Sequence, residues 1–481
     1  MQLSKLIKNI KYLELVNYKN VKINSISMHH TNCTKSSLFF AIDGFNTSGR
    51  MYAQDAVQNG AVAIVCSKKI DVDNVIQIIV DDVRSCMSII ANTFYGCPQK
   101  RIKIIAVIGS NGKTTTANIL YNILKFCGKK VGLIGTLGVK INDISLPSEL
   151  TTPDPIELNY YMQQMVNFGC EYCVMELSAH AIALNKMYGI KVFCGIFTNI
   201  SNEHLDFFKN MQNYAMTKVG YFNPSNMNYA IVNVDDKYGK LIALDSNLKV
   251  FTYGLYNPAD IFAINIKYNL KKCSFIVNSN DKIAKVVSSF VGEYNVYNVL
   301  GAISCAELIG CEFDSIVLAL SSIKNISGRM EVFDFTKDKK VVVDFAHTPD
   351  GFEKVLSLVR KVRNGGRIIT LFGSVGYADS AKRKLMGQIA LKYSDIVILT
   401  SDNPGKMGFD AVCDDIGIFG DNVVRIEDRI KAIEYGVGIM QEHDTLVCLG
   451  KGGETKQVVN NAVLPYNEVD VVKSAIRRAK G

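Results

Sequence analysis

A short glycine-bearing run has the residue types of a phosphate cradle. It consists of Gly109, Ser110, Asn111, Gly112, Lys113, Thr114 and Thr115. Its glycines allow backbone amides to turn toward a polyphosphate, and a helix expected from Thr115 would add the positive end of its dipole. Lys113 would meet the terminal phosphates, and the hydroxyl of Thr114 or Thr115 could hold magnesium. The first glycine of the full Walker pattern is missing, so the run predicts a nucleotide site with a structural glycine turn as the alternative.

An acid and a histidine follow two other apolar stretches. Glu176 closes one stretch and is followed by Ser178, and His204 comes soon after a stretch that ends at Phe197. Ligands of open α/β sheets gather at the carboxyl ends of strands, so Glu176 and His204 should converge on the phosphates held by Lys113. A carboxylate and an imidazole beside a triphosphate suit a divalent cation, most simply magnesium. Taken singly, Glu176 could be a strand-end cap and His204 an ordinary loop histidine.

Continuous apolar stretches that alternate with helical patterns must position these groups. Around the glycine-bearing run, strands are expected at 104–108, 131–135, 172–176, 192–197 and 229–233, with a helix from 115 to about 126. Further strands are expected at 340–344, 367–372, 395–399 and 445–449. Near the N-terminus, strands at 37–44 and 60–66 enclose a helix at 52–60. This alternation predicts an α/β fold with parallel sheets covered on both faces.

The length of 481 residues is too great for one hydrophobic core. The patterns divide the chain into a small α/β domain at 1–98, a central domain with a parallel sheet and the phosphate loop at 99–328, and a second doubly wound, Rossmann-like unit at 329–481. The first boundary follows Tyr95 to Pro98, and the second falls at the Gly328-Arg329 turn.

Composition narrows the class of protein. Hydrophobic residues make up 48% and charged residues 21%, and no apolar run approaches the roughly 18 residues of a membrane span. The N-terminus does not resemble a secretory signal, so we expect a cytoplasmic protein without a membrane span. The 54 basic and 45 acidic residues are dispersed, which favours attraction of small anions over nucleic-acid binding. Cys170 and Cys173 form the only CxxC pair, within an expected buried strand, so packing is favoured over metal or redox chemistry.

Taken in order, the motifs resemble those of the Mur ligases, most closely those of the UDP-N-acetylmuramyl-tripeptide synthetase type. Beyond the phosphate loop, the resemblance rests on segments spread over nearly the whole chain. They are residues 150–154, 175–181, 197–206, 218, 292–298, 327–331, 344–351, 382–383, 401–404 and 450–454.

The resemblance implies an ATP-dependent carboxylate–amine ligase of three domains, which bind a UDP-linked substrate, ATP and an amino acid in turn. The implied reaction adds an amino acid of the diaminopimelate or lysine type to UDP-N-acetylmuramoyl-L-alanyl-D-glutamate through an acyl phosphate, in peptidoglycan synthesis. The implied cofactors are ATP and Mg²⁺, and the implied partners are the UDP-linked muramyl peptide and a free amino acid. A monomer is expected.

The resemblance also assigns roles by position. The implied catalytic residues are Lys113, Glu176, His204 and Lys218, and the implied metal ligands are Thr114, Glu176, His204 and a carbamylated Lys218. Nucleotide contacts are implied for the phosphate loop and for Asn295, Arg329 and Asp344. Substrate contacts are implied for Thr151, Thr152, Ser178, Lys186, Asp402, Asn403 and Glu454. Outside this context, Lys218 could be a solvated helix lysine and Arg329 part of a surface ion pair.

Several positions depart from the family pattern, mostly where the substrates are expected. Residues 29–31 read His-His-Thr in place of Asp-Ser-Arg and otherwise predict an exposed turn. Ala179 replaces serine, Lys186 replaces arginine, and Gly453 replaces histidine. Gly405, followed by Lys406, stands where diaminopimelate-adding members have an arginine that grips the distal carboxylate. A Gly-Gly-Asp-Arg-Asp stretch is replaced at 375–379.

Two other hypotheses stay open. Because the ATP-site motifs are retained while the acceptor-facing ones differ, the chain could be a Mur-ligase paralogue that joins another carboxylate and amine, in the manner of cyanophycin-type or folylpolyglutamate-type enzymes. It could also be a nucleotide-binding scaffold with weak catalysis, although the intact Lys113, Glu176, His204 and Lys218 favour an enzyme.

Overall fold

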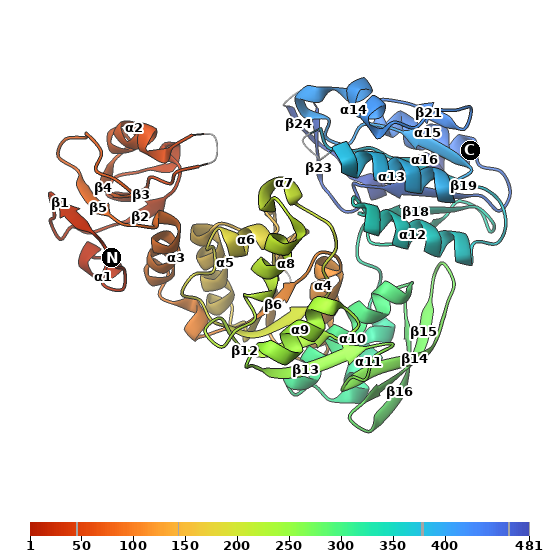
Figure 1. The fold of residues 1–481 in the computed structure, drawn as a ribbon, viewed down its shortest axis with the longest axis horizontal. Coiled ribbons are helices and arrows are strands. Elements are labelled where there is room, and N and C mark those ends of the chain that lie inside the picture. Colours follow the sequence, from red (N-terminus) through yellow and green to blue (C-terminus); the bar gives the residue numbers. More distant parts are fainter. Residues whose placement is uncertain (45–46, 143, 377–379, 460–461, 481) are drawn as a thin grey trace.

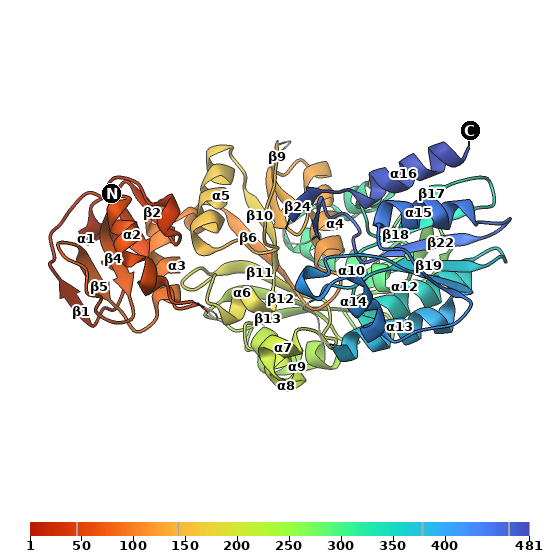
Figure 2. The same cartoon turned by 90° about the horizontal axis from the view of Figure 1, so that it is seen from above.

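A computed structural model describes residues 1–44, 47–142, 144–376, 380–459 and 462–480. The chain forms three bodies in a row, with the N-terminal body at one end and the C-terminal body at the other (Figures 1 and 2). Each body contains a sheet of its own. No helix in the described ranges is long and apolar enough to cross a membrane.

The N-terminal body is a small sheet packed against short helices. Its strands run in the order β1-β5-β4-β3-β2, and β1 alone is antiparallel to its neighbour. The strands are β1 (Glu14–Val16), β2 (Ser25–Ser27), β3 (Ser37–Phe40), β4 (Ala61–Cys66) and β5 (Ile76–Ile79). The helices are α1 (Leu3–Leu6), α2 (Ala53–Gln58) and α3 (Val83–Phe94). The predicted strand, helix and strand of this region are thus present, although β3 ends earlier than expected.

The central body is built on one large sheet in the order β16-β15-β14-β13-β12-β11-β6-β10-β7-β8-β9. Its parallel core comprises β6 (Lys103–Ile108), β7 (Val131–Gly135), β10 (Tyr172–Leu177), β11 (Val192–Phe197), β12 (Met227–Asn233), β13 (Lys249–Gly254) and β14 (Ile261–Tyr268). Antiparallel strands extend both edges: β8 (Gly138–Ile141), β9 (Ile144–Leu146), β15 (Cys273–Ser279) and β16 (Lys282–Ser288). Five strands of the parallel core were predicted, namely β6, β7, β10, β11 and β12, whereas β13, β14 and the antiparallel edge strands were not.

Helices cover both faces of the parallel core, which explains why central strands such as β6 are apolar at nearly every position. In β6, Ile105 and Val107 enter one hydrophobic core, and Ile104, Ala106 and Ile108 enter the core on the opposite face. The helices are α4 (Lys113–Phe126), α5 (Pro155–Asn167), α6 (Ala179–Ala183), α7 (Leu205–Phe208), α8 (Met211–Val219), α9 (Lys237–Asp245), α10 (Glu293–Leu308) and α11 (Phe313–Ser322).

The C-terminal body is a second α/β unit whose sheet runs β17-β18-β22-β19-β20-β21. Its strands are β17 (Glu331–Asp334), β18 (Lys340–Asp344), β19 (Ile368–Phe372), β20 (Ile396–Leu399), β21 (Val423–Arg425) and β22 (Thr445–Leu449). Only β17 pairs antiparallel, at the edge. The helices are α12 (Pro349–Val362), α13 (Ser380–Tyr393), α14 (Phe409–Ile416), α15 (Arg429–Gly438) and α16 (Glu468–Ala479), and β23 (Lys456–Val459) pairs with β24 (Ala462–Pro465) in a separate hairpin. The four predicted strands of this unit are present.

Candidate active site

The glycine-bearing run connects the centre of the large sheet to a helix. Strand β6 lies between β10 and β11 and ends at Ile108, and α4 begins at Lys113, two residues earlier than expected. Gly112 has a φ of +88°, and a Cβ built there would lie 2.2 Å from Oδ1 of Asn298. A Cβ at Gly109 would lie 1.9 Å from Oγ1 of Thr198. Glycine is therefore required at both ends of the turn, as a phosphate-binding loop needs.

The lysine of the loop is folded back onto the loop itself. Lys113 Nζ donates hydrogen bonds to the carbonyl oxygens of Gly109, at 2.9 Å, and Ser110, at 2.7 Å. Phosphate oxygens are stronger acceptors than these carbonyls because they carry charge. The ammonium group is therefore placed where it can exchange backbone contacts for phosphate contacts.

Glu176 lies at the end of β10, beside the phosphate loop. The parallel register pairs it with Val107 of β6, and its side chain is buried. Its carboxylate accepts hydrogen bonds from Thr114 Oγ1 at 2.8 Å and from the backbone amide of Thr136 at 2.8 Å. The predicted convergence of Glu176 on the loop is thus present, and Thr114 is the contact point.

His204 approaches the loop from the other side of β6, after β11. It precedes α7 with a φ of +57°, and its ring packs edge-to-face against His180, with ring centroids 4.6 Å apart. Burial lowers the pKa of His204 to about 4, although Glu203 at 3.4 Å favours the protonated form. The imidazole is therefore neutral near pH 7, which is the form that binds a metal ion.

Lys218 is a buried lysine beneath the loop and not a solvated one. Its side chain is 1% exposed, and Nζ donates to Ser110 Oγ at 3.3 Å and to the hydroxyl of Tyr214. Burial, with the charge of Lys113 in addition, holds the pKa of Lys218 well below its usual value. The prediction that this lysine belongs to the phosphate site is consistent with these contacts.

The third body reaches the same loop through an arginine. Arg329 Nη2 donates to Thr114 Oγ1 at 3.0 Å, and its guanidinium stacks on Phe345 with 4.2 Å between the guanidinium carbon and the ring centroid. Arg329 Nε is buried without a hydrogen-bond partner. A buried donor without an acceptor is costly, so it points to a ligand acceptor at this place. Asp344, also buried, accepts from the backbone amides of Met330 and Ala346 and so fixes the turn that carries Arg329.

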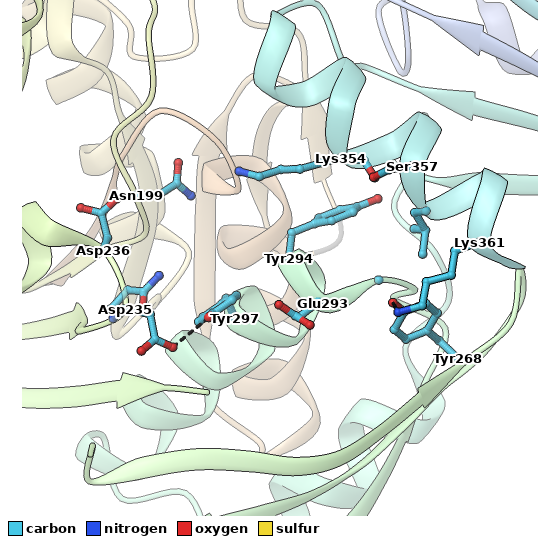
Figure 3. Close-up of a pocket in the computed structure, with 13 residues that line it drawn as sticks. Asn199, Asp235, Asp236, Tyr268, Glu293, Tyr294, Tyr297, Lys354, Ser357 and Lys361 are labelled. Carbon is cyan, nitrogen blue, oxygen red and sulfur yellow. Dashed lines mark hydrogen bonds between the residues drawn. The ribbon is translucent and has the colours of Figure 1, made fainter. Parts of the chain in front are cut away.

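A cavity opens between the phosphate loop, the start of α10 and the first turns of α12. Residues that line it include Asn111, Asn295, Arg329, Asp344, His347 and Lys354. A second cavity adjoins it and shares Asn199, Tyr294 and Lys354 with it (Figure 3). Three predicted nucleotide contacts from separate segments, Asn295, Arg329 and Asp344, thus line one cavity beside the loop.

Three residues predicted to meet the acceptor substrate are already engaged within the central body. Thr152 Oγ1 donates to the carbonyl of Glu176 at 2.9 Å and accepts from the amide of Ser178 at 3.1 Å. Lys186 Nζ lies 3.0 Å from Asp154 and donates to the carbonyl of Thr152 at 3.1 Å. Thr151 contacts Thr136 through their hydroxyls at 3.1 Å. Their contacts tie these residues to the strand that carries Glu176.

The residues predicted to meet the amino acid form a cluster in the third body. At its centre is Lys451, a fully buried lysine that the sequence analysis did not single out. Its Nζ lies 2.9 Å from Asp402, 2.9 Å from Asn403 Oδ1 and 3.0 Å from Glu454. Lys451 therefore holds these three residues together, and its charge partly offsets the negative charges of Asp402 and Glu454.

The structure also places other positions that were predicted to differ from the family pattern. His29 and His30 lie in an exposed to half-exposed turn, as predicted, and the ring of His30 stacks on Tyr52 with centroids 4.6 Å apart. Ala179 packs with Phe208 and Tyr214 in a small apolar cluster. The replaced stretch at 375–379 extends into residues 377–379, which lie outside the described residues. Cys170 and Cys173 are buried free thiols whose pKa values burial raises, which agrees with a packing role.

The donor set fits a magnesium ion only in part. Thr114 and Glu176 supply adjacent oxygen atoms, which suit a hard cation, and His204 supplies a neutral imidazole. Within the described residues, no group of three or more His, Cys, Asp or Glu side chains is placed to hold a metal ion. A complete shell would therefore need phosphate oxygens, water or a carbamate on Lys218.

Several contributors escaped the sequence analysis. Glu203 has a side chain that is 8% exposed, lies 3.6 Å from His347 Nε2 and accepts a hydrogen bond from Tyr214. Burial opposes its ionisation, but the hydrogen bond from His347 and the charge of Lys113 hold the pKa of Glu203 well below its usual value. The segments 197–206 and 344–351, which were recognised in the sequence, contain Glu203, His347 and Asp350. Their position next to residues with assigned roles was therefore the one sequence signal that could have identified them.

The fold and the site together define the class of protein. It is an α/β protein in which a third body covers a phosphate-binding loop. Family models agree along the chain. The Mur ligase family, catalytic domain, matches residues 17–95, the Mur ligase middle domain matches 107–306, and the Mur ligase, glutamate ligase domain, matches 328–452. The chain belongs to the Mur ligase family.

Full-length relatives narrow the type. The chain is 36% identical over 485 residues to the UDP-N-acetylmuramoyl-L-alanyl-D-glutamate--2,6-diaminopimelate ligase of Caldanaerobacter subterraneus, covering 100% of both. It is 36% identical to ligase 1 of that name from Clostridium acetobutylicum, covering 99% of each. A solved structure of a ligase of the same name matches with a TM-score of 0.70 at 27% identity, over 100% of this chain and 99% of the other. MurF from Acinetobacter baumannii, at 16% identity and a TM-score of 0.68, shares the fold.

These similarities confirm the predicted three-domain α/β Mur ligase of the tripeptide-synthetase type, and with it an amide-bond-forming ligase that uses ATP. The boundaries at 98 and 328 and the roles of individual residues stay predictions.

Proposed function

We propose that the chain adds an amino acid to UDP-N-acetylmuramoyl-L-alanyl-D-glutamate in the cytoplasm, with ATP as the energy source. The observation that carries the proposal is the hydroxyl of Thr114, which donates to Glu176 and accepts from Arg329. At this one atom the phosphate loop, a carboxylate from the sheet and a cation from the third body meet. This is the set of groups that phosphoryl transfer to a carboxylate requires.

The reaction proceeds in two steps. The acceptor's carboxylate attacks the γ-phosphorus, so a carboxylate–phosphorus bond forms while the bond to ADP breaks. Lys113 and Arg329 offset the negative charge that crowds together. The neutral amine of the amino acid then attacks the acyl carbon, inorganic phosphate leaves, and the amine loses a proton. The third body, by covering the loop, excludes the water that would hydrolyse the acyl phosphate.

We assign Mg²⁺ to Thr114, Glu176, His204 and Lys218, completed by phosphate oxygens. The ion would supply positive charge to the phosphate oxygens. Lys218 takes part as a carbamate: its neutral amine adds to carbon dioxide, a carbon–nitrogen bond forms, and a proton is released. The burial and low pKa of Lys218 support this assignment because only the uncharged amine can react.

The incoming amino acid is of the diaminopimelate or lysine type. The names of the relatives favour diaminopimelate. Against it, Gly405 has no side chain to hold a distal carboxylate, and the nearby Lys451 is already paired with two acids. A paralogue with another acceptor is the second candidate, favoured by the stacked His30–Tyr52 pair in the region expected to contact uridine.

A product assay tests the proposal. Full-length protein receives ATP, Mg²⁺, UDP-N-acetylmuramoyl-L-alanyl-D-glutamate and, in separate reactions, diaminopimelate, lysine or other amines, and products are read by mass. We expect one tripeptide product and equal amounts of ADP. Absence of product with every amine, while ATP is turned over with another carboxylate acceptor, would establish the paralogue. Nucleotide binding without turnover under any condition would establish the scaffold.

A further inference from the structure

The third body holds the phosphate loop at a second point, distinct from Arg329. Asn111 Nδ2 donates to Asp350 Oδ2 at 2.7 Å, across 239 positions of sequence. The same oxygen accepts from Lys354 Nζ at 2.7 Å. Asp350 and Lys354 lie one turn apart on α12, so a loop amide, a carboxylate and an ammonium form a continuous chain between two bodies.

Both ends of this chain are rigidly mounted. The backbone of Asn111 is fixed by the segment after β11: its carbonyl accepts from Thr198 at 2.7 Å, and its amide donates to Asn199 at 3.1 Å. On the other side, α12 starts at a Thr348 cap and buries one face in the core of the third body. A displacement of the third body therefore changes the Asn111–Asp350 distance directly.

A simpler explanation exists for part of this arrangement. An aspartate in the first turn of a helix, with a lysine four residues later, stabilises an isolated helix whether or not anything else is near. That explanation accounts for Asp350 and Lys354 but not for the loop amide. It also does not explain why Lys354 lines both cavities beside the loop, or why its side chain extends toward Asn199 (Figure 3).

We propose that Asn111, Asp350 and Lys354 form the latch through which the third body closes on the nucleotide-loaded loop. Asp350 is the positioning residue, because it holds the loop through Asn111. Lys354 is its counter-charge: when phosphates occupy the loop, an unneutralised Asp350 would repel them, and the ammonium group removes that repulsion. The inference deepens the proposed ligase function and rests on it for its effect on turnover.

The charges of Asp350 and Lys354 should produce an unusual order of nucleotide affinities among the variants. Lys354→Met leaves Asp350 unneutralised beside the phosphates and should weaken binding of the fluorescent nucleotide mant-ADP about tenfold. Asp350→Ala removes both the contact with Asn111 and the repulsion of the phosphates, and it should weaken mant-ADP binding only about threefold. The double variant should bind like Asp350→Ala, better than Lys354→Met alone.

Matched controls and a kinetic readout separate a latch from a helix pair. Glu353→Gln changes a neighbour on α12 that pairs with Lys392 at 2.9 Å, away from the loop, and should change nothing. Asp350→Asn keeps an acceptor for Asn111 without the charge and should restore affinity to within twofold of the parent. With ATP as varied substrate, Asp350→Ala should raise KM for ATP about threefold and change kcat less than twofold. Thermal unfolding of each variant verifies folding.

The inference is overturned if folded Asp350→Ala and Lys354→Met both bind mant-ADP within twofold of the parent, or if the double variant binds more weakly than Lys354→Met. Because this titration needs neither acceptor nor amine, its result is independent of the product assay. An active parent with unchanged variants would sink the latch alone, and an inactive parent with the expected order of affinities would sink only the proposed reaction.

Discussion

The phosphate site and the acid–lysine cluster of the third body are built in different ways. At the phosphate site, Glu176 lies at the end of a central strand, Lys113 opens a helix, and Arg329 comes from another body, so three rigid elements meet at one hydroxyl. In the cluster, Lys451 is surrounded by residues of two loops of one body. The phosphate site still has an unpartnered donor in Arg329, whereas Lys451 has its acceptors in place.

This difference bears on Gly405, one of the positions predicted to depart from the family pattern. A group at a strand end is positioned by the whole sheet, so replacing it removes a function without a local substitute. A loop residue such as Gly405 can change while the sheet behind it stays intact. The residues predicted to transfer the phosphoryl group and Gly405, predicted to affect the choice of amino acid, therefore lie on different kinds of structure.

Lys113→Ala should break the phosphate site most severely. Loss of the ammonium group that meets the transferring phosphate should lower ATP-dependent coupling by more than about 1000-fold. The rate of ADP formation with the best acceptor pair measures this. Lys125→Ala, at an exposed position in the last turn of α4, is the control and should retain activity. Turnover retained by Lys113→Ala would discredit the assigned loop.

Lys218→Met should separate function from stability. Activity should fall between about 100- and 1000-fold through loss of a metal ligand, while the free energy of unfolding at pH 7 rises by about 1 kcal/mol because a buried amine is replaced by an apolar chain. The pKa of Lys218 is lowered in the folded protein, so below a pH of about 10.4 the unfolded chain binds a proton that the folded chain does not. The stability gained by Lys218→Met should therefore shrink as the pH rises toward that value. Urea unfolding at pH 7 and 9.5, without bicarbonate, measures it. If Lys218→Met instead destabilised the protein as much as a disrupted hydrophobic core does, Lys218 would not be a buried, uncharged amine.

Lys451→Met should show that the third-body cluster depends on one cation. Removing it leaves Asp402 buried beside Glu454 without compensation, so the protein should lose about 3 kcal/mol of stability. Chemical denaturation measures the loss, and Lys431→Met at an exposed position on α15 serves as the control. Equal stability of the two variants would mean that the cluster is solvated.

Gly405→Arg should have the smallest effect of these variants, and the effect should be on the choice of amino acid. The added guanidinium should shift preference toward diaminopimelate over lysine about tenfold, since a charge-assisted pair with a carboxylate is worth roughly 1.4 kcal/mol. The φ of +59° at Gly405 favours glycine, so some stability is lost as well. Gly417→Arg, at a φ of +70°, carries the same strain elsewhere. An identical product ratio in both variants would remove Gly405 from the specificity site.

Much of the fold followed from local pattern. The apolar run 104–108 and the glycines after it predicted β6, the loop and α4, because strands buried on both faces are apolar throughout. The strands β13 and β14 and the antiparallel edges β8–β9 and β15–β16 were not predicted, since half-exposed strands give a weaker signal that turns and edges interrupt.

The sequence by itself determined the family, the phosphate loop and the two strands that carry Glu176 and precede His204, because motif order and apolar runs are local properties of the chain. Only the tertiary structure decided that Thr114 is shared by Glu176 and Arg329, that Lys218 is buried, and that Asp350 meets Asn111. Those contacts join residues up to 239 positions apart, and their energies depend on burial and on the angle at which separately folded bodies pack.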